Sequence, residues 1–202
     1  MTEPSPPRPS GSVIVRRSSQ ATIIPSRRRL PLGWPLVLVV GAAIVALSAQ
    51  VVVPVPGSPV PITLQGLAVL LVGGLFGSAI GAGALVLYLV LGAFGAPVFA
   101  PIGPPGLARL FGPTGGYLLA FPFAAGIVGR IAERGRFGRC LLAAFTGMAL
   151  IHLGGWAQLA VLGRNGGAVT LGVTPFLVQD LLKVVLVAAI LWRGHLALRL
   201  RS

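Results

Sequence analysis

The chain has 202 residues, of which 55% are hydrophobic and 9% are charged, and its mean hydropathy is +0.92. Soluble domains carry about 25% charged residues, so this composition excludes an ordinary soluble domain and indicates a polytopic membrane protein. The net charge of +13 does not indicate a nucleic-acid partner, because the Arg residues flank apolar segments, where positive charge sets orientation and meets anionic lipid headgroups.

The N-terminal segment, residues 1–33, is rich in Pro, Ser and Arg and contains a single acid, Glu3. Such a composition cannot bury a core, and we expect a disordered basic tail in the cytoplasm. The polar stretch is too long for a signal peptide, and the apolar run that follows is longer than a typical signal core. We therefore expect a retained first membrane helix.

Six apolar segments predict an all-α membrane domain, a single bundle of six transmembrane helices over residues 34–195, followed by a basic cytoplasmic tail at 196–202. A helix needs roughly 20 residues to cross a bilayer core. Three Gly within residues 77–83 predict a break between the second and third helices, and a Pro- and Gly-rich loop at 94–114 precedes the fourth. The predicted helices cover about residues 34–53, 62–76, 79–93, 115–132, 138–161 and 174–194.

The Arg residues support this count and set the orientation. Six Arg in residues 1–33, four in residues 129–139 and three at the C-terminus would face the cytoplasm, and Arg109 and Arg164 would face outside. A split of thirteen to two is what the positive-inside rule predicts for an even number of spans. Merging the second and third helices would place four Arg outside. We therefore expect both termini in the cytoplasm.

The last apolar segment contains the only Asp and the only Lys of the chain, Asp180 and Lys183. Either charge costs roughly 2.5–3.5 kcal/mol near the centre of a membrane helix, and their spacing puts both on one helix face. An internal ion pair that fixes packing is one interpretation. We favour a polar clamp in an outward-facing cavity, because nothing else requires either charge in an apolar helix.

Further polar residues fall in the outer half of the membrane under the same orientation, so we expect them to converge on this cavity. Thr114 is a candidate N-cap that leaves the backbone N–H groups of Gly115 and Gly116 available to an anion or a carbonyl. The structural alternatives are interhelical hydrogen bonding for Gln65, a headgroup contact for Arg109, and the interfacial aromatic belt for Tyr88 and Tyr117. The candidate substrate-binding residues are Thr63, Gln65, Arg109, Thr114, Gly115, Tyr117, Asp180 and Lys183.

Catalytic and metal chemistry has little support in the sequence. The one cysteine, Cys140, excludes an internal disulfide and a multi-Cys metal site, and the two His, at 152 and 195, have no acid near them in the sequence. We interpret His152 and Trp156 as packing or interface residues. No Walker-type phosphate loop is present, so we expect no cofactor, and any energy from ATP would come through a partner chain.

Four strings make the chain resemble the BioY family over about residues 36–195: "VPVPGSPVPITLQGLAVLLVGGLFG", "LYLVLGAFGAPVFA", "GPTGGYLLAFPFAAGIVG" and "GVTPFLVQDLLK". These are the substrate-binding S components of energy-coupling-factor (ECF) biotin transporters. The resemblance implies six transmembrane helices, an outward-facing pocket and high-affinity biotin capture at the plasma membrane of a bacterium or archaeon. It also implies a T component and two ATPase subunits as partners, although some members are thought to work without a dedicated ATPase module.

The resemblance implies residue roles as well. The family's last-helix motif, whose Asp and Lys contact biotin, matches Asp180 and Lys183, and the string "GPTGGY" matches Gly112–Tyr117. Ala42 and Ala46 look like the small-residue motif that docks the T component in related S components, although from spacing alone an internal packing face is equally compatible. The string "FAPIGPPGLARL" departs from the Gly-rich stretch that members often have, so we expect a stiffer loop.

The interpretation is biotin uptake without chemical conversion. Asp180 would accept a hydrogen bond from a ureido N–H, while Lys183, with or without Arg109, would bind the carboxylate or the carbonyl. The alternatives are an S component or solitary transporter for another small nutrient, a structural assembly protein, and a membrane-embedded enzyme. The enzyme is disfavoured because the sequence has no His cluster, carboxylate pair or nucleophile–base set. The oligomeric state stays open, a homo-oligomer included.

Overall fold

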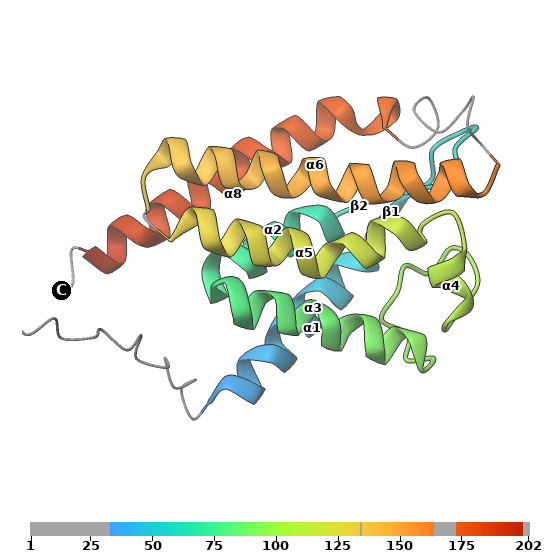
Figure 1. Cartoon of the computed structure of the whole chain (residues 1–202), viewed down its shortest axis with the longest axis horizontal. Coiled ribbons are helices and arrows are strands. Elements are labelled where there is room, and N and C mark those ends of the chain that lie inside the picture. The colour runs from blue at the N-terminus through green and yellow to red at the C-terminus, as the bar shows by residue number, and fades with distance from the viewer. Residues whose placement is uncertain (1–32, 134, 164–172, 200–202) are drawn as a thin grey trace, which may run out of the picture. The chain divides into compact units, whose positions relative to one another are not determined.

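The computed structural model describes residues 33–133, 135–163 and 173–199. The chain divides into two units, residues 1–30 and 31–202. Of the basic tail predicted at 1–33, residues 1–32 lie outside the described residues, as do residues 200–202. The described part of the second unit is mostly helical, with its main helices packed side by side (Figure 1). Those helices are α1 (Trp34–Ala49), α2 (Gln65–Phe76), α3 (Ser78–Ala93), α5 (Gly115–Ala132), α6 (Phe137–Val161) and α8 (Leu177–Arg199).

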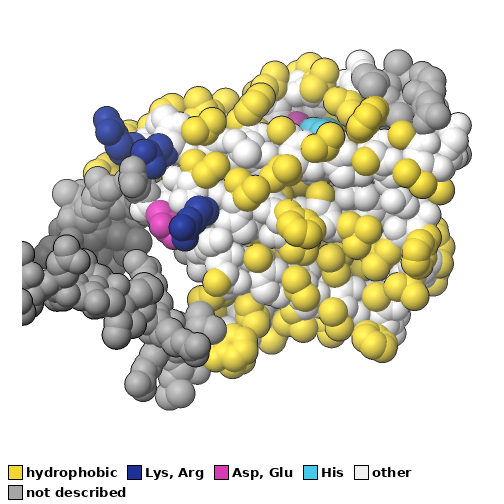
Figure 2. All heavy atoms as spheres, viewed as in Figure 1, with side chains coloured by type: hydrophobic (Ala, Val, Ile, Leu, Met, Phe, Trp, Pro, Cys, Tyr) yellow, Lys and Arg dark blue, Asp and Glu magenta, His cyan; other side chains and the backbone are white. Residues whose placement is uncertain are grey.

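Three stretches of the described chain are long and apolar enough to cross a membrane: Gly115–Ala132, Phe137–Val161 and Thr174–Gly194. The apolar helices α1, α2 and α3 are shorter, at 16, 12 and 16 residues. At 1.5 Å per residue, 12 residues cover about 18 Å of a hydrocarbon core about 30 Å thick. Hydrophobic side chains are spread over the visible face of the bundle (Figure 2), as expected for a membrane protein.

The predicted break between the second and third helices is present. Helix α2 ends at Phe76 and α3 begins at Ser78, and the residue between them, Gly77, has φ +84°. Glycine adopts this conformation readily because it has no Cβ. Close packing at the break uses another glycine, Gly129 of α5, where an added Cβ would overlap the backbone of residues 77 and 78.

The boundaries of the first two helices differ from the prediction. Residues 52–53 form strand β1 (Val52–Val53), which pairs antiparallel with β2 (Ile62–Thr63), so α1 ends at Ala49 and α2 begins at Gln65. The prolines between the strands cannot continue a helix, and β-branched residues favour the paired strands. The all-α expectation is therefore corrected by one short hairpin, whose second strand enters α2.

Two smaller helical segments also depart from the prediction. The Pro- and Gly-rich loop contains α4 (Ala108–Phe111), and a 3-10 turn, η1 (Thr174–Phe176), precedes α8. Helix α8 continues to Arg199, beyond the predicted end at residue 194.

Helix α5 packs against α2, α3 and α6. The contact between α5 and α6 is close because Gly116 faces Gly154, and a Cβ at Gly116 would overlap the carbonyl oxygen of Gly154. Small residues permit this approach of two helix backbones in a membrane protein. These contacts hold the start of α5 against α6, next to the cavity described below.

The small residues of α1 face the bundle. Ala42 is 3% exposed, Ala46 is half-buried against the core, and a Cβ on Gly41 would lie 2.8 Å from the Cβ of Ala84. This face packs on α2 and α3 within the chain, as the packing alternative expects. Docking of a partner on Ala42 and Ala46 stays a prediction, and it would require these side chains to become accessible.

Candidate functional site

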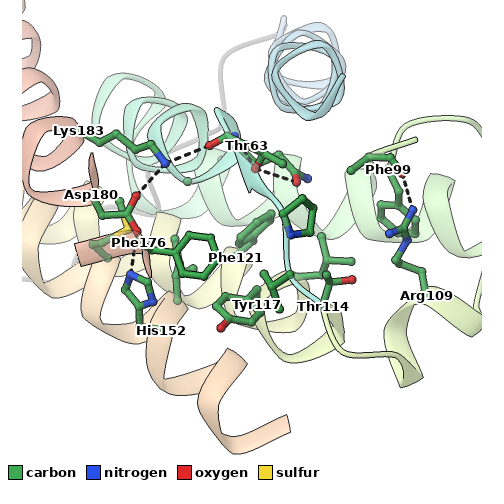
Figure 3. A pocket seen from close by; sticks show the side chains of 18 residues that line it. Thr63, Phe99, Arg109, Thr114, Tyr117, Phe121, His152, Phe176, Asp180 and Lys183 are labelled. Carbon is green, nitrogen blue, oxygen red and sulfur yellow. Dashed lines mark hydrogen bonds and ion pairs between the residues drawn. The ribbon is translucent and has the colours of Figure 1, made fainter. Parts of the chain in front are cut away.

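A cavity with about 670 Å³ of empty space, its open mouth included, lies among β2, α2, α5, α6, α8 and the loop before α4 (Figure 3). Seven of the eight predicted substrate-binding residues line it: Thr63, Gln65, Arg109, Thr114, Tyr117, Asp180 and Lys183.

At one end of the cavity, Asp180 is 7% exposed and is held by donors on both of its carboxylate oxygens. The Lys183 ammonium donates to Asp180 Oδ1 at 2.7 Å and to the backbone carbonyl of Thr63 at 3.0 Å. The Nε2 of His152 lies 2.8 Å from Asp180 Oδ2. An ionised carboxylate can only accept, so His152 Nε2 is the donor. An ammonium has three N–H groups, which leaves one of Lys183 for a ligand.

His152 is the site residue that sequence reasoning missed. It was interpreted as a packing or interface residue, and the structure adds a polar contact with Asp180, which is 28 residues away in the chain and is brought to it by the packing of α6 on α8. The centroid of the His152 ring also lies 6.3 Å from the ring centroids of both Tyr117 and Phe176. The available signal was an ionisable residue inside an otherwise apolar membrane helix, which by itself indicates a functional position.

Gln65 and Thr63 are tied to each other and to α3. Gln65 Nε2 donates to the hydroxyl of Tyr88 at 2.6 Å, and its Oε1 accepts from Thr63 Oγ1 at 3.2 Å. Tyr88 is 0% exposed and meets Phe99 edge-on, with centroids 5.4 Å apart. Tyr88 therefore lies inside the bundle, and the interfacial belt that was one alternative for it does not apply. Gln65 forms a hydrogen bond between α2 and α3, which was the structural alternative for it, and it also lines the cavity.

Arg109 is buried, at 5% exposure, although a headgroup contact was one alternative for it. Its Nη1 and Nη2 donate to the backbone carbonyls of Ile102 and Ala100, so the guanidinium fastens the Pro-rich loop. Its Nε is buried without a partner, and among the described residues no acid pairs with it. Burial lowers the pKa of the Arg109 guanidinium, which nevertheless stays protonated in proteins. A buried cation without a counter-charge favours an anionic ligand beside it.

The start of α5 departs from the predicted arrangement. Thr114 occupies the N-cap position and lines the cavity, but its side chain makes no capping hydrogen bond. Gly115 does not line the cavity, because it packs so closely on Leu110 that a Cβ would overlap the Leu110 carbonyl. Tyr117 is 9% exposed and its ring covers Gly155, so it lies inside the bundle and not in an interfacial belt.

The cavity has charged groups at both ends and aromatic side chains between them (Figure 3). The cluster of Asp180, Lys183 and His152 lies at one end, and Arg109 lies at the other beside Phe99. Aromatic side chains occupy the middle, from Tyr117, Phe121 and Phe176. Among the described residues, no group of three or more metal-ligating side chains gathers. The arrangement suits an elongated organic ligand with polar groups at both ends.

Comparison with known proteins gives a concordant result. The sequence model of the BioY family matches residues 26–200. The chain is 40% identical over 141 residues to the "Probable biotin transporter BioY" of Pyrococcus horikoshii, which covers 70% of this chain and 83% of that protein. It is 36% identical over 143 residues to the "Biotin transporter BioY" of Thermotoga maritima, with 70% and 84% covered.

A solved structure shares the fold. It is the crystal structure at 2.1 Å of the S-component for biotin from an ECF-type ABC transporter, with a TM-score of 0.71 over 80% of this chain and 90% of that chain. The sequence identity is 23%, so this likeness concerns the fold alone.

Proposed function

This chain belongs to the BioY family, and on that premise we propose that it binds biotin from the outer side of the membrane for uptake into the cell. The matching relatives are transporters by name, and the protein is accordingly a transporter component and not an enzyme. The observation that carries the proposal is the Asp180–Lys183 ion pair at one end of a cavity whose other end has a buried cation, Arg109, with no acidic partner among the described residues.

The paired end matches the ureido group of biotin. That group offers two N–H donors and one carbonyl acceptor. Asp180 has lone pairs left on both oxygens after its two hydrogen bonds, and Lys183 has one N–H left. We place a ureido N–H on the Asp180 carboxylate and the ureido carbonyl on the Lys183 ammonium.

The other end matches the valerate carboxylate. Lys183 is already compensated by Asp180, whereas Arg109 has no acidic partner among the described residues. An anion gains more from an uncompensated buried cation than from one already paired. The carboxylate therefore belongs at the Arg109 end, and the ring system and valerate chain lie against Tyr117, Phe121 and Phe176.

The topology that we propose for this protein has six transmembrane helices, an outward-facing cavity and both termini in the cytoplasm. Six apolar helices in the described residues support it. The exposed Arg side chains of the visible face gather at one end of the bundle (Figure 2), where α5 ends and α6 begins. Asp180 lies in the first turn of α8, and Arg193 lies near the opposite end of that helix. If this positive charge lies on the cytoplasmic side, as the positive-inside rule expects, the cavity faces the outside.

The proposal includes partners and a location. The sequence has no G-x-x-x-x-G-K-[ST] motif, so the energy for uptake would come from a T component and two ATPase subunits. The membrane would be the plasma membrane of a bacterial or archaeal cell, and its lipids would meet the apolar surface of the bundle.

Titration calorimetry of the purified protein in detergent tests the binding step. We expect saturable binding of biotin at micromolar concentration or below. We expect weaker binding of biotinamide, in which a neutral amide replaces the carboxylate. Other small vitamins in competition test the substrate class. An absence of biotin binding, or an equal preference for another vitamin, would overturn the proposal. Uptake by cells that express this chain with and without a T–ATPase module tests the partners.

A further inference from the structure

We infer that His152 is a positioning residue of the biotin site, which holds the Asp180 carboxylate in the orientation that the ligand meets. This inference rests on the proposed function, because it assigns Asp180 to the ureido end of biotin. His152 acts through Asp180, by a hydrogen bond from its Nε2 to Asp180 Oδ2 at 2.8 Å.

Lys183 alone cannot define the plane of the Asp180 carboxylate. The two residues are on the same helix, three positions apart, and their contact uses only Oδ1. The terminal torsion of an Asp side chain is broad, so one donor leaves the second oxygen free to rotate. A donor from a different helix removes that freedom. His152, on α6, supplies it to Oδ2.

The His152 ring is itself held in place. The Tyr117 ring meets it nearly edge-on, with an interplanar angle of 81°, and the Phe176 ring is tilted by 44°. The side chain is 15% exposed, and its Nδ1 is buried without a partner. With the ring enclosed in this way, His152 makes its polar contact with Asp180 through Nε2.

The same bond lies in the wall between the cavity and a second hollow. His152 and Asp180 both line an apolar groove between α6 and α8, together with Leu153, Trp156 and Leu181. Without a donor at position 152, Asp180 Oδ2 would face this apolar groove. Leaving a charged oxygen without its partner in such surroundings is costly, so the carboxylate would rotate out of the orientation that the ligand meets.

A packing role for His152 makes a different prediction. If the ring only fills space between Tyr117 and Phe176, Phe should replace it without loss of affinity. If the donor to Asp180 matters, Gln should be the better substitute, because its amide nitrogen can reach the position of His Nε2 while the ring is lost. The two variants therefore separate ring from donor.

The experiment is titration calorimetry with biotin on detergent-purified wild type, His152→Phe, His152→Gln and Asp180→Asn. We expect His152→Phe to bind about ten- to a hundredfold more weakly, the range of one charge-assisted hydrogen bond. His152→Gln should bind at least fivefold more tightly than His152→Phe. Leu153→Ala, on the same helix and facing the groove, is the control and should match wild type.

Each outcome decides the inference. A Phe variant with wild-type affinity would overturn the inference about His152, and so would Phe and Gln variants that bind equally weakly. If at the same time Asp180→Asn loses binding, the proposed function still stands. Wild type that does not bind biotin would overturn both. Size-exclusion chromatography and thermal unfolding check that each variant folds, and His152→Met replaces the Phe variant as the donor-free form if Phe does not fit.

Discussion

Neutralising the buried charge pair separates its structural role from its role in binding. Asp180→Asn keeps the shape of the side chain and removes its charge, so Lys183 loses its counter-charge in a setting where its side chain is 13% exposed. Asp180→Leu combined with Lys183→Met removes both charges. A pair kept only for packing should tolerate the double change, whereas a binding pair should not.

The magnitude follows from the contacts of Asp180. Its carboxylate accepts two charge-assisted hydrogen bonds, at 2.7 and 2.8 Å, and each is worth about 1.5–3 kcal/mol. Breaking a buried pair from one side costs about 3–5 kcal/mol. An Asn side chain still accepts one of the two bonds, so we expect the free energy of unfolding to fall by about 3 kcal/mol in Asp180→Asn. The double variant should lie within about 1 kcal/mol of wild type, because no uncompensated charge remains.

Binding should respond differently. A loss of about 3 kcal/mol at the ligand corresponds to about a hundredfold weaker affinity, and we expect at least this loss in both the Asn and the double variant. Denaturant unfolding in mixed micelles measures the stability, and titration calorimetry measures the affinity. A double variant that binds biotin like wild type would refute the assignment of this pair to the ligand. An Asn variant as stable as wild type would refute the reasoning from burial.

Three further predictions concern the loop, the helix packing and the orientation. Arg109→Lys loses the planar fork that holds two loop carbonyls, so biotin affinity should fall about tenfold, and the preference for biotin over biotinamide should shrink in calorimetry; an unchanged preference would place the carboxylate elsewhere. Gly116→Ala should lower the free energy of unfolding by about 1–3 kcal/mol because its Cβ would overlap the carbonyl oxygen of Gly154. Gly138→Ala, which has open space around it, is the matched control in the same thermal unfolding assay, and equal stability of the two variants would contradict the packing argument. A cysteine at position 183, in a chain whose single native cysteine is replaced by Ala, should react with a membrane-impermeant thiol reagent added outside; labelling only from the cell interior would contradict the outward-facing cavity.

Several features of this protein could be predicted from local sequence. The fourth predicted helix, residues 115–132, coincides with α5, and the break at Gly77 was expected from the glycines around it. The i,i+3 contact of Asp180 with Lys183 also follows from spacing alone, because both residues are on one helix. Helix length, hydropathy and charge placement are properties of neighbouring residues, and they need no knowledge of the rest of the chain.

Other features depended on contacts between segments that are distant in sequence. The short hairpin of residues 52–53 and 62–63 replaced predicted helix ends, and close packing on Leu110 kept Gly115 from the cavity. The Arg109 guanidinium donates to backbone carbonyls of the Pro-rich loop. The hydrophobic periodicity of the sequence does not predict the conformation of such a loop.

The sequence by itself determined the class of protein, most of its helices and the charged pair of the last helix, because each depends on residues within a few turns of one another. The tertiary structure alone decided that His152 meets Asp180 and that Arg109 is left as a buried cation without an acid among the described residues. Those contacts depend on how α6 packs against α8 and on how the loop before α4 brings its carbonyls to Arg109. Side-chain packing between helices sets both, and spacing along the chain does not encode it.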